Sequence, residues 1–95
     1  MAETIGKITN IKLITVDPGF PNAIDAGAIT IKETATNLSW LFYLWVSHAQ
    51  DPAVDRVLAS QRLALAREAA FRKLTVHVLH DAASDLANEI SVDIP

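Results

Sequence analysis

The sequence predicts an all-β domain with a single helix, with its elements in the order β-β-β-α-β-β. Three observations indicate this class. β-branched residues are frequent before the helix, one helical segment begins near residue 51, and an alternating pattern of period two returns after residue 73. A chain of 95 residues that is 51% hydrophobic can bury one core but not two, so we expect residues 1–95 to form a single domain.

The first strand is expected over residues 5–16, which are rich in Ile, Thr and Val. Its apolar residues change face near Thr9 and Asn10, and this break in the alternation predicts a bulge or a bend. Residues 17–27 contain two prolines and two glycines, a composition typical of a long loop. A strand that changes face is typical of a curled sheet or a barrel.

The second and third strands are expected over residues 28–34 and 39–46. The second alternates strictly, with Ile29 and Ile31 on one face, which predicts a half-buried strand. The third is apolar on both faces, of which only one can line a barrel. One face carries Trp40, Phe42, Leu44 and Val46, and the other carries Leu41, Tyr43 and Trp45. Three explanations stay open for the face that does not line the barrel: burial beneath the helix or loops, a subunit interface, or a platform on which bases or sugars stack.

Asp51 and Pro52 predict the start of a helix, with Asp51 as the N-cap and Pro52 at the first helical position. The helix is expected to continue to residue 72. The stripe expected to face the core consists of Val54, Val57, Leu58, Gln61, Leu65 and Ala69. A second strip of smaller residues consists of Ala59, Leu63, Ala66 and Ala70. This second strip either packs the helices of neighbouring copies together or is exposed and reflects helix propensity.

Two further strands are expected over residues 75–80 and 89–94, joined by a loop over residues 81–88. His77 and His80 lie three residues apart, so on a strand they point to opposite faces and cannot chelate one metal ion. We therefore expect neither a metal nor any other cofactor.

Charge and composition exclude several classes of function. The chain has 8 basic and 11 acidic side chains, whereas a protein that binds duplex nucleic acid usually presents a net basic face. It has no cysteine for thiolate chemistry, and no nucleophile-elbow, P-loop or dinucleotide motif, so we expect no enzyme activity and assign no catalytic residue. Its longest apolar run, residues 40–46, is far shorter than the ~20 residues that span a bilayer, so we expect no membrane insertion. The expected location is cytoplasmic, or secreted if a leader was removed.

Five strands with one helix between the third and the fourth is the connectivity of the OB-fold, a small, partly open Greek-key barrel. The segments GKITNI at residues 6–11, LTVHV at 74–78 and NEISV at 88–92 resemble those of small bacterial OB-fold proteins related to the B subunits of subtilase-type AB5 toxins. Such B subunits form rings, typically pentamers, and bind glycans on host cells. The resemblance therefore implies a homo-oligomer with a carbohydrate ligand, and it carries over no individual glycan-binding residue.

In the OB-fold, the loops between the first and second and between the fourth and fifth strands flank the binding face. The candidate ligand-binding residues lie on these loops and on the second and third strands: Phe20, Asn22, Asp25, Lys32, Tyr43, Trp45, Ser84 and Asp85. The candidate subunit interface consists of Leu41, Tyr43, Trp45, Ala59, Leu63, Ala66 and Ala70. The leading hypothesis is a non-enzymatic homo-oligomer, in a ring or another arrangement, that binds a glycan or another small ligand. The alternatives are a self-assembling structural protein without a small ligand and a binder of single-stranded nucleic acid.

Overall fold

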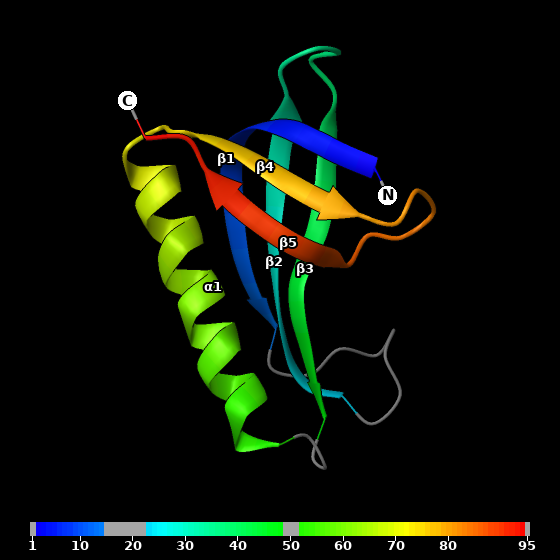
Figure 1. Cartoon of the computed structure of the whole chain (residues 1–95), viewed down its shortest axis with the longest axis vertical. Helices are drawn as coiled ribbons and strands as arrows, with labels where there is room; N and C mark the ends of the chain where they lie inside the picture. Colours follow the sequence, from blue (N-terminus) through cyan, green and yellow to red (C-terminus); the bar gives the residue numbers. More distant parts are fainter. Residues whose placement is uncertain (1, 15–22, 49–51, 95) are drawn as a thin grey trace.

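The structure, a computed structural model, describes residues 2–14, 23–48 and 52–94. Within these residues it contains five strands and one helix, which lies between the third and fourth strands (Figure 1). The strands are β1 (Ala2–Ile14), β2 (Ala23–Glu33), β3 (Ser39–His48), β4 (Thr75–His80) and β5 (Ala87–Val92), and the helix is α1 (Ala53–Phe71). The predicted class and the predicted order of elements are therefore confirmed.

The ends of the elements follow backbone pairing more closely than side-chain alternation. β4 covers residues 75–80 as predicted, whereas β2 begins at Ala23 rather than at residue 28. β5 covers residues 87–92 rather than 89–94, because its pairing with β4 already begins where His80 meets Ala87.

The five strands form one sheet in the order β3-β2-β1-β4-β5, and each neighbouring pair is antiparallel. β1 pairs with both β2 and β4, and Gly6 has a partner on each side. The two edge strands also approach each other. Tyr43 of β3 forms a parallel bridge with Leu86, and its backbone N–H donates to the carbonyl oxygen of Asp85 at 2.7 Å. The sheet therefore curls into a barrel-like shape, with α1 along one side (Figure 1).

β1 contains the predicted irregularity. Ile8 pairs with Ile31 and Asn10 pairs with Thr30, so Thr9 is the additional residue of a β-bulge. A bulge bends its strand and increases the local twist. This bend lets a single strand pair with β2 and β4 on a curled sheet.

β3 contains a second bulge, which the apolar pattern of the sequence does not predict. Gly27 pairs with Trp45 and Ala28 pairs with Tyr43, so Leu44 has no partner of its own on β2. Leu44 is fully buried, and Trp45 packs against the same core. The alternation is shifted by one residue here, and the expectation that Trp45 shares a face with Tyr43 is therefore wrong.

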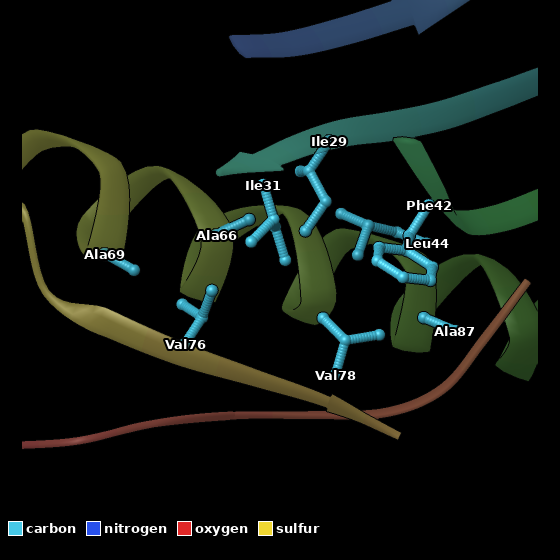
Figure 2. Close-up of a cluster of buried hydrophobic side chains, with 9 residues drawn as sticks. All are labelled: Ile29, Ile31, Phe42, Leu44, Ala66, Ala69, Val76, Val78 and Ala87. Carbon is cyan, nitrogen blue, oxygen red and sulfur yellow. The ribbon is translucent and has the colours of Figure 1, made fainter. Parts of the chain in front are cut away.

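The core lies between the sheet and α1. Figure 2 shows its buried side chains, which are Ile29, Ile31, Phe42, Leu44, Ala66, Ala69, Val76, Val78 and Ala87. The strands supply the branched and aromatic members, whereas α1 supplies only alanines to this cluster. Short side chains let the helix approach the sheet closely.

The expectation for the two sides of the helix holds at Ala69, which is buried, and is wrong for the larger residues of the same stripe. Ala59 and Ala66, from the small-residue strip, are buried, whereas Val54, Leu58 and Leu65, from the stripe expected to face the core, are exposed. The physical reason is space, because protein cores are close-packed and the strands already fill this one with branched side chains. Ala59 and Ala66 are therefore buried within their own chain, whereas Leu63 and Ala70 of the same strip are only partly buried.

α1 begins at Ala53 with Pro52 as its N-cap, one position later than predicted. Asp51, the predicted N-cap, lies outside the described residues. At the other end, Lys73 adopts a φ of 54°, the left-handed conformation that commonly ends a helix, and the chain turns there into β4.

Candidate functional site

A groove of about 500 Å³ opens where the β2–β3 turn and the β4–β5 loop meet the first residues of β1. The other described pockets have volumes of about 300, 220 and 270 Å³. The groove is lined by Thr4, Glu33, Trp40, Leu41, Phe42, His80, Ala82, Ala83, Ser84 and Asp85. Its volume lies within the range of roughly 300–1,000 Å³ that is typical of sites for small molecules.

One side of the groove is formed by Thr4 and Phe42, which are buried, and by His80, which is partly buried. The His80 ring lies 4.6 Å from the Phe42 ring, centroid to centroid, at an angle of 45°. Nδ1 of His80 donates to the carbonyl oxygen of Asp81 at 3.0 Å, so in the neutral ring Nε2 accepts from the hydroxyl of Thr4, also at 3.0 Å. Both ring nitrogens are engaged, and they hold the ring in one orientation.

Trp40 forms an exposed aromatic wall of the groove. Its Nε1 donates to Oε1 of Glu33 at 3.3 Å, and the hydroxyl of Thr36 donates to the same oxygen at 2.6 Å. These two bonds connect the indole to the β2–β3 turn, although 47% of Trp40 stays exposed. The result is an aromatic surface that is both accessible and positioned.

The β4–β5 loop forms another part of the groove lining. Its Asp85 carbonyl accepts from the backbone N–H of Tyr43, and Oγ of Ser84 accepts from the backbone N–H of Leu86 at 3.1 Å. Among the described residues that line the groove, Glu33 and Asp85 are acidic and none is Lys or Arg. The groove is therefore suited to neutral ligands or to hydrogen-bond donors, and not to anions.

The structure divides the eight predicted ligand-binding residues. Ser84 and Asp85 line the groove, and the backbone of Tyr43 holds their loop. Phe20 and Asn22 lie outside the described residues.

Asp25 and Trp45 lie elsewhere, beside α1. Nε1 of Trp45 donates to Oδ1 of Asp25 at 2.8 Å, and the indole lies over Gly27, where a Cβ atom would overlap the ring. Both residues line a smaller pocket of about 300 Å³ together with Leu63. Lys32 is exposed on β2 and lines neither pocket.

The predicted subunit interface is not a continuous surface. Ala59 and Ala66 are buried within the chain, Leu63 and Ala70 are partly buried, and Leu41 is exposed at the groove. Trp45, Ala59 and Leu63 meet at the pocket beside α1, whereas Leu41 lies at the groove, so the predicted interface residues are divided between two places.

Most of the groove could not be predicted from the sequence, because the lining residues come from distant parts of the chain. Thr4 and His80 are bonded although they are 76 positions apart. One signal was available: His80 has the same strand parity as Val76 and Val78, which predicts that it faces the barrel interior.

A separate charged cluster lies at the other face of β4. Nε2 of His77 bonds Oδ2 of Asp93 at 2.9 Å, and Nδ1 lies 3.6 Å from Oε2 of Glu3. The hydrogen bond to Asp93, supported by the negative charges of Asp93 and Glu3, raises the pKa of His77 above its ordinary value of 6.5, against a smaller opposing effect of desolvation. The cluster ties the start of β1 and the residue after β5 to β4.

This cluster predicts a pH dependence of stability. Because the folded-state pKa of His77 is raised, its contribution to stability is complete below pH 6.5 and is lost as the pH rises through the folded-state pKa. We expect the urea midpoint to fall between about pH 6 and about pH 8, and His77→Gln to reduce this fall. The Asp93→Asn variant should behave in the same way, and an unchanged pH profile in both variants would contradict the prediction.

The chain matches no family model, no curated protein and no solved structure. Within the described residues, no helix has the length and hydropathy needed to cross a membrane, and no group of three or more His, Cys, Asp or Glu is placed to hold a metal ion. The functional conclusion therefore depends on the geometry of the groove.

Proposed function

We propose that the chain is a non-enzymatic binding module with an OB-like barrel, which takes a glycan or another small uncharged ligand in the groove beside Trp40. The observation that carries this proposal is the exposed indole of Trp40, which Glu33 positions at the wall of a groove of about 500 Å³. The order of the elements and the parallel bridge between β3 and Leu86 support the OB-like assignment. The resemblance to glycan-binding B subunits supports the same ligand class.

The groove offers both kinds of contact that a sugar needs. The apolar C–H face of a sugar ring packs on an aromatic ring, and Trp40 supplies such a surface. Sugar hydroxyl groups donate hydrogen bonds, and the carboxylates of Glu33 and Asp85 are strong acceptors. A ligand of this kind would gain affinity from stacking and specificity from the carboxylates.

We propose binding without catalysis, because the hydroxyl that is paired with the histidine of the groove is buried. His80, the only histidine among the described lining residues, uses both ring nitrogens for bonds to Thr4 and to the backbone of Asp81. A hydroxyl bonded to a histidine can act as a nucleophile only where a substrate reaches it, and Thr4 is only 6% exposed.

Binding of single-stranded nucleic acid and self-assembly without a ligand are both less well supported as functions of the groove. Single-stranded nucleic acid would bring phosphates near Glu33 and Asp85, where like charges repel. Self-assembly without a small ligand is supported by the exposed apolar side chains of α1, which lie outside the groove.

The test is a glycan array followed by isothermal titration calorimetry with the glycan that binds best. We expect Trp40→Ala to weaken binding by at least ~10-fold, which corresponds to about 1.4 kcal/mol of lost contact. Leu38→Ala is the matched control, because Leu38 is also exposed near the β2–β3 turn but does not line the groove.

A silent array, or equal affinity of the parent protein and Trp40→Ala, would contradict the proposal. Binding of a labelled oligonucleotide that weakens steeply with salt would favour the nucleic-acid alternative instead.

A further inference from the structure

α1 carries a row of large apolar side chains on its exposed side. We call this row the outer stripe, and its members are Val54, Val57, Leu58, Gln61 and Leu65. Its four aliphatic members are between 38% and 60% exposed. At 100° per residue, the five residues fall within an arc of about 100° and a length of about 17 Å, so they form one continuous surface.

The distribution of side chains on α1 is the reverse of what an isolated domain needs. The helix packs alanines against the sheet and presents its valines and leucines to solvent. A monomeric helix normally buries its larger apolar side chains and exposes polar ones. Beside Leu58, a pocket of about 220 Å³ is lined in part by Asp55 and Arg62, so the apolar surface ends there.

The occupant that fits this surface is a second copy of the same chain. Between Val54 and Leu65 the outer stripe contains no charged residue, so two identical stripes can meet without repulsion, although the chain as a whole has a net charge of −3. Two-fold dimers are the commonest oligomers because one patch then serves both partners. By contrast, the groove is acidic and would repel its own copy.

The available area predicts a weak dimer. A stable interface buries about 800 Å² on each partner. The entire accessible surface of this chain is 6005 Å², so an interface of that size would need a large share of it. One helix face supplies roughly a few hundred Å², the size at which exposed apolar patches mark interaction sites. We therefore expect a dissociation constant in the range of roughly 1–100 µM.

We infer that two copies of this chain pair through the outer stripes of α1, with the two helices antiparallel. In that arrangement Leu58 of each copy faces Leu65 of the other, and Gln61 lies next to its own copy at the two-fold axis. An antiparallel pair also places the positive end of each helix dipole near the negative end of the other. The interface lies apart from the groove, so it does not depend on the ligand proposed above.

The first test is sedimentation velocity at protein concentrations from about 1 to 500 µM, which bracket the expected constant. We expect the parent protein to change from monomer to dimer, and Leu58→Glu to remain monomeric while its circular dichroism spectrum is unchanged. Phe71→Glu is the matched control, because Phe71 is 85% exposed on the same helix but lies outside the outer stripe, and it should dimerise like the parent. A parent protein that stays monomeric throughout would overturn the inference.

The second test uses the absence of cysteine from the sequence, which makes engineered disulfides unambiguous. A disulfide requires Cα atoms about 4.4–6.8 Å apart. We expect Gln61→Cys to cross-link with its own copy, and a mixture of Leu58→Cys and Leu65→Cys to form the mixed dimer in preference to either homodimer. Preferential homodimers of Leu58→Cys and of Leu65→Cys would show parallel helices and overturn the inference. A monomer that co-sediments with phosphatidylcholine vesicles would also overturn it, because the stripe would then face lipid.

Discussion

Gly6→Ala is expected to lower the free energy of unfolding by about 3 kcal/mol, which is a large part of the stability of a small domain. A Cβ atom at Gly6 would overlap the backbone carbonyl oxygen of Lys32 and would press on the Ile31 side chain. Since β1 is paired with β2 on one side and with β4 on the other at this residue, the backbone cannot shift without breaking a ladder. Urea denaturation followed by circular dichroism measures the loss.

Gly27→Ala is the informative comparison for this prediction. A Cβ atom there meets the ring of Trp45, a side chain that can move, rather than backbone. We expect a smaller loss than for Gly6→Ala, together with a change in tryptophan fluorescence. If the free energy of unfolding of Gly6→Ala lies within about 1 kcal/mol of that of the parent, the contact between β1 and β2 at Gly6 has room for a Cβ atom and the prediction is wrong.

Arg62→Met is expected to destabilise the protein by a similar amount, about 3 kcal/mol, because Arg62 joins the two edges of the sheet. Its Nη1 donates to the carbonyl oxygen of Leu44 at 2.7 Å and to that of Ala87 at 3.3 Å, and Nη2 donates to the carbonyl oxygen of Asn88 at 3.3 Å. Leu44 is the bulged residue of β3, and the other two acceptors belong to β5. β3 and β5 do not pair with each other at these residues, and the guanidinium connects their carbonyl oxygens instead.

Arg67→Met is the control for this substitution, because Arg67 is exposed on the same helix. Besides the urea midpoint, amide hydrogen exchange separates the two variants, since only Arg62→Met should speed exchange in β5. Equal exchange and equal midpoints in the two variants would mean that the single bridge at Tyr43 closes the sheet without the arginine.

Local features of the fold could be predicted from local patterns. The alternation of Ile29 and Ile31 follows from the period of a strand, and the change of face near Thr9 follows from a break in that period. Both depend on neighbouring residues alone, and the structure confirms both.

The candidate site could be predicted only in part. Ser84 and Asp85 follow from the place of the β4–β5 loop, whereas the sequence places Trp40 only on a face of the third strand. The difference between Trp40 at the groove and Trp45 beside α1 depends on the bulge at Leu44, where one unpaired residue shifts the alternation. No apolar pattern distinguishes these two tryptophans, because the segment is apolar on both faces.

By itself, the sequence determined the class, the order of the elements, the helix, and the absence of cysteine chemistry. These properties follow from periodicity and composition, which act over a few residues. Only the tertiary structure decided which side of α1 is buried, how β3 meets β5 and which side chains share the groove. Each of these depends on the space left between segments that are far apart in the chain. Branched side chains from several strands fill the core, and the space that remains beside the helix fits only alanine.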